Sequence, residues 1–263
     1  MAEAVGPYLA LAGILGRRTG ELHARLAAHS QDPGFAPEPF TRHDLRLTAA
    51  AMRRNAEEQL SLVERHLDRL GDRRAALARE VLAHRDDMLR LFDEIDGIEA
   101  GGQRIRCHGD YHLGQILVTE GDVVIFDFEG EPARSLDERR RKCSPLRDVA
   151  GMLRSFSYAA LTGLAAATAR RPEDMERLAP WAELWERWVG GTFLRAYLDA
   201  ARPSSILPER PDDIEALLHL FLMDKAAYEI SYELNNRPDW IHIPLAGMLR
   251  LRAPAGPTVR QTR

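Results

Sequence analysis

The feature that most constrains the fold of this chain is a short β-rich stretch, residues 103–131, between two long segments patterned for helices. Within it, the runs 104–107, 115–118 and 123–126 have the composition of strands. The Glu-Gly-Asp of residues 120–122 is a tight turn that joins the last two runs into a hairpin. The pattern predicts a mainly α fold of the α+β class, with helices around a small β-hairpin.

The segments on either side carry helical periodicity. Residues of one helical face recur at steps of four, three and four at Leu15, Thr19, Leu22 and Leu26, and glycines and prolines separate one periodic segment from the next. The tail 253–263 has no apolar period, so we expect it to be flexible. The expected helices are 8–28, 41–71, 73–95, 146–169, 181–201, 212–235 and a short one that begins at Pro244.

The composition excludes several classes of protein. With 45% hydrophobic and 29% charged residues and a net charge of −4, the 263 residues can build one large domain or two small ones, and a disordered chain is excluded. No apolar run approaches the ~18–20 residues of a membrane span, and no signal peptide is evident. The acidic balance excludes a strong nucleic-acid binder. Cys107 and Cys143 are too few for a disulfide framework or a zinc site of their own. We expect a cytoplasmic protein with neither nucleic acid nor membrane as a partner.

The residues that indicate chemistry lie in the β-rich stretch. A loop carries His108 and Asp110, Gln115 follows five residues after that aspartate, and Asp127 stands at the end of a buried strand. Phosphoryl transfer needs such groups: one carboxylate accepts the acceptor's hydroxyl proton, while an amide oxygen and a second carboxylate hold Mg²⁺ on the nucleotide phosphates. The hairpin brings the two sets together in space. The spacing therefore predicts a phosphotransferase.

Five runs of the sequence resemble the maltokinases, a branch of the aminoglycoside-phosphotransferase-like kinases. The resemblance covers nearly the whole chain and corresponds to the C-terminal lobe of that protein-kinase-like fold, so residues 1–252 are expected to form this lobe. Its parts would be a helical part, 1–102, the catalytic and metal-binding β segment, 103–131, and a second helical part with the acceptor site, 132–252. The runs are HGDYHLGQILV at 108–118, VIFDFEGEP at 124–132, LRDVAGMLRSF at 146–156, LGRRTGELH at 15–23 and YELNNRPDWIHIPLAGM at 232–248.

The resemblance implies a reaction and a role for each residue of the catalytic run. Asp110 would be the catalytic base acting on the anomeric hydroxyl of maltose, with ATP as the donor and maltose 1-phosphate as the product, on a route from trehalose to glycogen. Gln115 and Asp127 would bind Mg²⁺ and, through it, the nucleotide. His108 would hold the catalytic loop in shape, and Asp148 would anchor that loop through its backbone N–H groups.

Two further sets of residues follow from the same resemblance. Glu129 stands where the kinase DFG motif has glycine, and it would assist a second Mg²⁺ or the sugar. A polar and aromatic cluster near the C-terminus would line the acceptor site, because carboxylates and arginine bind hydroxyl pairs while an aromatic face packs on the pyranose. The alternative is a capped, solvated helix end. The cluster consists of Glu229, Tyr232, Glu233, Asn236, Arg237 and Trp240.

The N-terminal lobe of such kinases has no counterpart in the sequence. The only lysines are Lys142 and Lys225, both after the catalytic run, and no Gly-rich loop precedes residue 97. We therefore expect an incomplete enzyme with little activity alone, completed by a missing N-terminal lobe or attached to a trehalose synthase, as the family often is. Two alternatives stay open: a small-molecule kinase lobe for an aminoglycoside or choline-like amine, and a non-catalytic sugar-binding remnant.

Overall fold

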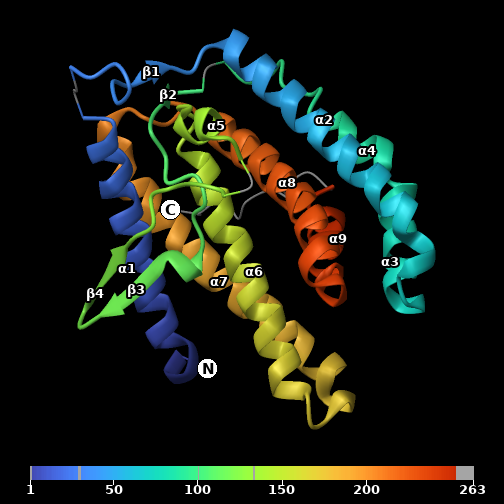
Figure 1. Ribbon diagram of the computed structural model, residues 1–263. Helices are drawn as coiled ribbons and strands as arrows, with labels where there is room; N and C mark the ends of the chain where they lie inside the picture. The colour runs from blue at the N-terminus through green and yellow to red at the C-terminus, as the bar shows by residue number, and fades with distance from the viewer. Residues whose placement is uncertain (1, 29–30, 100, 133, 253–263) are drawn as a thin grey trace. The chain divides into compact units, whose positions relative to one another are not determined.

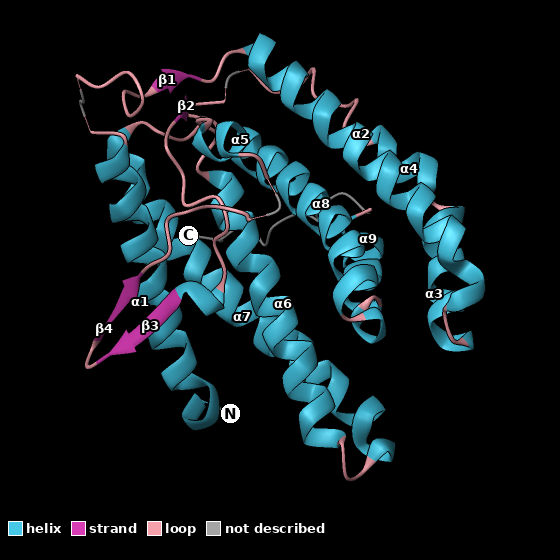
Figure 2. Ribbon diagram, viewed as in Figure 1, coloured by secondary structure: helices cyan, strands magenta, loops and turns pink. Residues whose placement is uncertain are grey.

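The computed structural model describes residues 2–28, 31–99, 101–132 and 134–252 (Figure 1). The chain divides into two compact units, the first made of Met1–Thr41 and Ala100–Ile214 and the second of Arg42–Glu99 and Glu215–Arg263. Helices dominate both, and the few strands are short, so the expected mainly α fold is confirmed (Figure 2). The expected flexible tail, 253–263, lies outside the described residues. The linear division at residues 102 and 131 stays a prediction.

The first unit is built on three long helices: α1 (Ala2–Leu26), α6 (Leu146–Thr168) and α7 (Met175–Ala201). Helix α1 packs along α7, and α7 also packs on α6 (Figure 1). Close packing of α1 on α7 depends on two glycines, because a Cβ at Gly16 would collide with the carbonyl oxygen of Phe193 and one at Gly20 would lie 2.7 Å from the Cβ of Ala200. Helix α7 begins six residues earlier than expected.

The short strands of the first unit frame the catalytic run. β1 (Glu38–Pro39) pairs antiparallel with β2 (Gln103–Arg104), and Ile105 then forms an isolated bridge with Cys143. The expected strand 104–107 is therefore shorter, because the chain turns into a loop after this bridge. The expected hairpin is confirmed: β3 (Ile116–Thr119) pairs antiparallel with β4 (Asp122–Ile125). Helix α5 (Leu136–Arg140) follows, capped by Ser135.

The second unit contains α2 (Arg42–His66), α3 (Asp72–Ala83), α4 (Arg85–Arg90), α9 (His242–Leu251) and most of α8 (Pro211–Asn236), whose first turn belongs to the first unit. Helix α2 packs on α3 and α4, and α3 packs on α9. The prediction of one helix over 73–95 is wrong. His84, with φ −106° and ψ 17°, leaves helical geometry and separates α3 from α4. Single 3-10 turns lie at Leu67–Arg69, Leu113–Gln115, Pro172–Asp174, Arg202–Ser204 and Pro238–Trp240.

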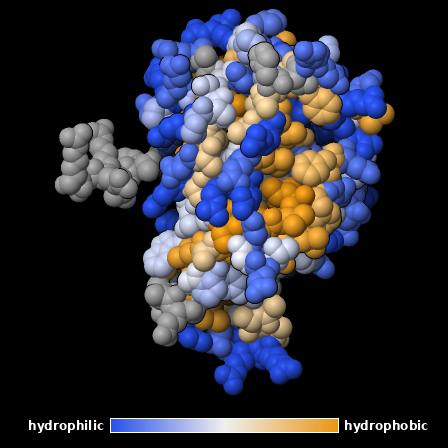
Figure 3. All heavy atoms as spheres, turned by 90° about the vertical axis from the view of Figure 1, so that its left-hand side faces the viewer, coloured by the Kyte–Doolittle hydropathy of each residue, from blue (hydrophilic) through white to orange (hydrophobic). Residues whose placement is uncertain are grey.

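One face of the β3–β4 hairpin is apolar and exposed. Leu117 and Val124 lie opposite each other in the register, with exposed fractions of 55% and 48%. Phe126 and Phe128, which follow β4, are also exposed, and so is Val118, which pairs with Val123 on the opposite face. Figure 3, which views the molecule from the side on which the hairpin lies in Figure 1, shows apolar side chains gathered on the surface seen from there. Such a patch on a protein surface marks a binding site or an interface.

None of the described helices is both long and apolar enough to cross a membrane.

Candidate active site

The catalytic loop follows the Ile105–Cys143 bridge, and His108 holds its shape from within. The His108 ring is buried and its Nε2 lies 2.8 Å from the carbonyl oxygen of Phe126, just after β4. A carbonyl only accepts, so Nε2 carries the proton and Nδ1 is left to accept the N–H of Asp110 at 3.4 Å. His108 thus ties the loop to the end of the hairpin. Gly109, with φ +87°, provides the left-handed turn between His108 and Asp110.

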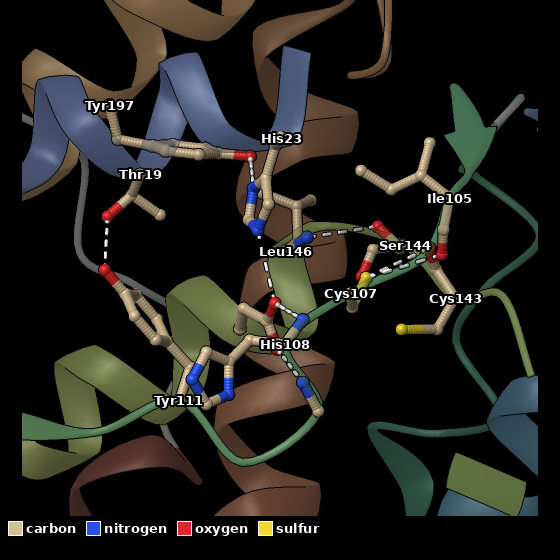
Figure 4. A network of polar contacts seen from close by, with 12 residues as sticks. Thr19, His23, Ile105, Cys107, His108, Tyr111, Cys143, Ser144, Leu146 and Tyr197 are labelled. Carbon is tan, nitrogen blue, oxygen red and sulfur yellow. Dashed lines mark hydrogen bonds and ion pairs between the residues drawn. The ribbon is translucent and has the colours of Figure 1, made fainter. Parts of the chain in front are cut away.

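Asp148 binds the same loop from the other side. It is the third residue of α6, where the helix N-terminus favours a negative charge. Its Oδ2 accepts the N–H of His108 at 2.7 Å and its Oδ1 accepts the N–H of Gly109 at 3.0 Å (Figure 4). Two backbone donors on one buried carboxylate fix the loop's backbone immediately before Asp110.

His23 of α1 is the partner of Asp148. Both side chains are 1% exposed, and His23 Nε2 lies 3.2 Å from Asp148 Oδ2. On its other nitrogen, Nδ1, His23 is 3.2 Å from the hydroxyl of Tyr197 in α7 (Figure 4). Burial raises the pKa of the Asp148 carboxyl, but the hydrogen bonds from His23, Gly109 and His108 outweigh it and the pKa is lowered from its ordinary value. Asp148 is therefore a carboxylate.

A second contact runs from α1 to the loop. The Thr19 hydroxyl donates to the carbonyl oxygen of Leu15 at 2.7 Å, so the Tyr111 hydroxyl, also 2.7 Å from Thr19 Oγ1, is the donor between these two side chains (Figure 4). Burial raises the pKa of the Tyr111 hydroxyl well above its ordinary value. Gly151 of α6 lets the loop approach, because a Cβ there would lie 2.6 Å from the carbonyl oxygen of Tyr111.

The two predicted metal ligands are in direct contact. The side-chain nitrogen Nε2 of Gln115 donates to Asp127 Oδ2 at 3.0 Å, and the Phe126 N–H donates to the backbone carbonyl oxygen of Gln115 at 3.2 Å. Asp127 has φ +65°, a strained conformation for a non-glycine residue of the kind that recurs at functional sites. The hairpin therefore brings the amide and the carboxylate to one place.

The donor set fits Mg²⁺. The side-chain nitrogen of Gln115 donates to Asp127. The side-chain oxygen Oε1 is therefore the Gln115 atom suited to a hard cation. Among the described residues no group of three or more His, Cys, Asp or Glu side chains could hold a metal alone. Mg²⁺ in nucleotide-binding enzymes is commonly held by one or two carboxylates together with substrate phosphates and water.

Asp110 lies on the loop with a side chain that is 18% exposed, so it can reach an acceptor in solution. The nearby His112 ring has its Nε2 3.7 Å from Asp110 Oδ2, and its Nδ1 accepts the N–H of Gly114 at 3.0 Å. Glu129 is exposed in the turn after Asp127. Among the described residues, no hydrogen bond or ion pair joins its carboxylate to Gln115 or Asp127.

The predicted acceptor residues form a group of their own in the second unit, at the end of α8. Arg237 binds the buried Glu233 through Nε and Nη2 at 3.1 and 2.7 Å, and its guanidinium lies 5.2 Å from the Tyr232 ring centroid and 4.4 Å from that of Trp240. Asn236 Nδ2 donates to the Tyr232 carbonyl oxygen at 2.8 Å. Glu229, one turn before Glu233, is buried at 7% exposure. Their contact with a substrate stays a prediction.

Sequence reasoning missed His23, Tyr197 and Ser155, whose Oγ accepts the N–H of Leu113 at 3.0 Å. Along the chain, His23 is 125 residues from Asp148 and 174 residues from Tyr197, and Ser155 is 42 residues from Leu113. Local patterns say nothing about such pairs. His23 does close the LGRRTGELH run, which was the one available signal.

A buried carboxylate that holds a His-Gly-Asp loop, with an amide–carboxylate pair at the foot of a hairpin, defines a kinase-like phosphotransferase. The chain belongs to the phosphotransferase enzyme family (APH), which it matches over residues 3–181.

Glucosamine kinases are among the proteins most similar to this chain. The one from Streptacidiphilus jiangxiensis is 27% identical over 235 residues, which cover 89% of this chain and 47% of that protein. A solved glucosamine kinase structure, crystal form B, superposes with a TM-score of 0.73 at 26% identity, over 94% of this chain and 54% of that one. A second, described as in complex with glucosamine, ADP and inorganic phosphate, has the same fold, with a TM-score of 0.72 at 24% identity, over 92% and 54% of the two chains. The chain thus spans about half of these relatives.

Proposed function

We propose that this chain is the acceptor-side lobe of an ATP-dependent sugar kinase. The observation that carries the proposal is the hydrogen bond between Gln115 and Asp127, tied to the catalytic loop by His108 through the Phe126 carbonyl. It joins the metal-binding pair to the loop that bears Asp110. A remnant used only for binding would have no need of this arrangement.

In the proposed reaction, Asp110 accepts the proton of a sugar hydroxyl as that oxygen attacks the γ-phosphorus of ATP. The bond from the γ-phosphorus to the bridging oxygen breaks, and ADP leaves with the electron pair. Gln115 and Asp127 would hold Mg²⁺, which would neutralise charge on the nucleotide phosphates. Asp148 and His108 keep the loop backbone fixed, so that Asp110 needs no reorganisation when the hydroxyl arrives.

The acceptor is proposed to be glucosamine. Two similar proteins are named glucosamine kinases, and a carboxylate such as that of Glu229 suits the ammonium group of an amino sugar. Maltose is the second candidate, favoured by the HGDYHLGQILV, DFEGEP and LRDVAGMLRSF runs, with maltose 1-phosphate as the product. In both cases Arg237, stacked between Tyr232 and Trp240, is proposed to contact sugar hydroxyls, and Glu233 holds that arginine in place.

We also propose that the chain is catalytically incomplete on its own. The exposed apolar face of the hairpin, at Leu117 and Val124, is the kind of surface that another protein segment covers. Of the two lysines, Lys142 forms an ion pair with Glu38 in the first unit, with Nζ 2.6 Å from Oε1. This ion pair occupies the ammonium group that would otherwise bind phosphates. The segment that covers the nucleotide phosphates would then come from outside this chain. We place the reaction in the cytoplasm, where ATP is available.

Isothermal titration tests the acceptor. Glucosamine and maltose are titrated into the chain with and without Mg²⁺–ATP, and the better ligand identifies the acceptor class. Glu229→Gln is expected to weaken the binding of glucosamine more than that of maltose, because only the amino sugar loses an ion pair. Asp137→Asn, at an exposed position of α5, serves as the control. Absence of binding by both sugars, with an aminoglycoside or choline bound instead, would reject the sugar assignment.

Phosphotransfer is tested separately, in the full-length enzyme that contains this lobe. Asp110→Asn is expected to lower kcat by about 10²–10⁴-fold with little change in sugar affinity, because a general base contributes that much. Asp127→Asn is expected to abolish the response to Mg²⁺. Unchanged turnover in Asp110→Asn would overturn the assigned base.

A further inference from the structure

His112 is the histidine of the catalytic run that has no role in the reaction proposed above. It stands two residues after Asp110 and three before Gln115, in extended backbone that leads into the turn Leu113–Gln115. Its ring nitrogen Nε2 lies 3.7 Å from Asp110 Oδ2, and its backbone carbonyl oxygen accepts the N–H of Gln115 at 2.9 Å. One residue therefore lies against both the proposed base and a proposed metal ligand.

The turn that follows His112 holds its ring in one orientation. The ring nitrogen Nδ1 accepts the N–H of Gly114 at 3.0 Å, so the side chain caps the turn. A Cβ at Gly114 would lie 2.7 Å from the ring carbon Cε1 and 2.8 Å from Nδ1, so the ring fits there because the residue is glycine. The Ser155 hydroxyl oxygen of α6 accepts the Leu113 N–H at 3.0 Å and fixes the backbone of the same turn. The fold therefore positions the ring, although 40% of the side chain is exposed.

The same cap determines which ring nitrogen of His112 carries the proton. A ring nitrogen that accepts an N–H has no proton of its own, so the proton of the neutral ring is on Nε2. Nε2 is the nitrogen that faces Asp110, and a donor beside a carboxylate oxygen is an attractive contact. At 3.7 Å the contact is longer than a hydrogen bond, as catalytic contacts often are before the substrate binds.

We propose that His112 is a positioning residue that aligns the Asp110 carboxylate to accept the proton of the sugar hydroxyl. A carboxylate held at one oxygen does not turn about its Cβ–Cγ bond, so the lone pair that accepts the proton keeps its direction. Because the His112 carbonyl also holds the N–H of Gln115, this one residue sets the base and the metal-binding pair relative to each other. The inference rests on the proposed function, since it assigns a role in the same reaction.

Asparagine and glutamine separate the two functions of the ring. Asparagine has an acceptor near the position of Nδ1 and is a good N-cap, but its side chain ends short of Nε2, whereas glutamine carries an N–H donor as far as Nε2. His112→Asn is therefore expected to keep the melting temperature and the KM for the sugar but to lower kcat by about 10–10²-fold, the cost of a misplaced catalytic group. His112→Gln is expected to keep more of kcat than His112→Asn, at a lower melting temperature.

Steady-state kinetics and thermal unfolding of the full-length enzyme that contains this lobe test the role, with glucosamine and Mg²⁺–ATP as substrates. His43→Asn makes the same change at an exposed histidine of α2 and is expected to leave kcat unchanged. A double variant tests whether His112 acts through the base. In the Asp110→Asn background, His112→Asn is expected to cause no further loss of kcat, because the group that it aligns is already gone.

Turnover by the unmodified enzyme separates this inference from the proposed function. If the unmodified enzyme phosphorylates a sugar and His112→Asn matches its kcat, the role of His112 is wrong while the proposed function stands. A raised KM with unchanged kcat would put the ring on the sugar and overturn the positioning role, as would an equal further loss of kcat in the Asp110→Asn background. Absence of phosphotransfer to any sugar by the unmodified enzyme would overturn the proposed function and this inference together.

Discussion

At the scale of single residues, the buried carboxylate of Asp148 decides whether the catalytic loop keeps its shape. It has three donors: the backbone N–H groups of His108 and Gly109, and the ring of His23. A buried carboxylate is stable only when its donors are complete. His23 is therefore a positioning residue, since it acts on the loop through Asp148 without touching the loop's backbone itself.

Replacement of His23 tests this role. His23→Leu keeps most of the buried volume but removes a donor from Asp148 and the partner of the Tyr197 hydroxyl. We expect the free energy of unfolding to fall by about 3 kcal/mol, as when one member of a buried pair is removed. His23→Gln retains an N–H donor and is expected to lose less than half as much. Denaturant unfolding measures both, and equal losses in the two variants would contradict the role.

The depressed pKa of Asp148 has a consequence for stability in acid. The folded protein holds this carboxyl's pKa below the ordinary value of 3.8, chiefly because hydrogen bonds outweigh burial. A depressed folded pKa gives stability that is complete above the unfolded pKa and is lost as the pH falls through the folded value. We expect the stability advantage of the unmodified chain over Asp148→Asn to shrink below about pH 4. Urea unfolding at several pH values measures it, and an advantage that does not change with pH would contradict the ionised state.

At the scale of elements, α1 is the scaffold of the site. It packs along α7 and carries both Thr19, bonded to Tyr111, and His23, bonded to Asp148. Gly16 and Gly20 let the backbones of α1 and α7 approach each other. His23, one turn after Gly20, thereby comes within hydrogen-bond distance of the Tyr197 hydroxyl. The Arg18–Asp122 ion pair, at 2.6 Å, ties the β3–β4 hairpin to the same helix, although as a half-exposed pair it adds little.

A pair of identical substitutions on α1 tests the close helix contact. The Cβ of Gly16→Ala would collide with the Phe193 carbonyl oxygen, whereas the nearest atom to the Cβ of Gly13→Ala is Thr192 Cγ2 at an ordinary 3.7 Å. We expect Gly16→Ala to destabilise by roughly 2 kcal/mol, the usual cost of overpacking. Gly13→Ala is expected to be neutral or to stabilise by up to about 1 kcal/mol, because alanine favours a helix. Equal melting temperatures for the two variants would show that α1 can move away from α7.

The sequence predicted those elements and site residues whose signals are local. The Glu-Gly-Asp turn specified the hairpin, and the spacing of Gln115 and Asp127 specified the pair that the hairpin brings into contact. The roles assigned to these two residues and to Asp110 stay predictions. It did not predict β1, because Glu38–Pro39 becomes a strand only by pairing with residues 103 and 104. It also did not predict the break at His84, where the apolar pattern continues through a residue that leaves helical geometry.

At the scale of the whole molecule, each compact unit is assembled from two separate stretches of chain. The first joins α1 to the stretch that contains the catalytic run, α6 and α7, and the second joins α2–α4 to most of α8 and to α9. Local composition and periodicity are read along the chain in order. They cannot reveal such a division, because it depends on packing between segments that are distant in sequence. The predicted site residues divide in the same way, with the proposed catalytic and metal-binding groups in the first unit and the proposed acceptor group in the second.

The apolar face of the hairpin is the feature of the surface that most needs an explanation. Leu117 and Val124 face each other across the hairpin and are about half exposed, whereas Val123 on the other face is buried at 7% exposure. If another segment covers the first face in the working kinase, that face is exposed in the chain alone and favours self-association. We expect Leu117→Thr with Val124→Thr to reduce association at high concentration, measured by sedimentation, while the free energy of unfolding changes by less than about 0.5 kcal/mol, as is usual for surface positions.

The opposite face of the same strand supplies the control. Val123→Thr places a hydroxyl in a buried position, so it is expected to lower the free energy of unfolding by about 1–3 kcal/mol and to leave association unchanged. Loss of stability in the Leu117 and Val124 double variant would mean that this chain covers that face itself. The proposal of an incomplete lobe would then lose its structural support, whereas the assignment of Asp110, Gln115 and Asp127 would stand, because it depends on the loop and the foot of the hairpin and not on its exposed face.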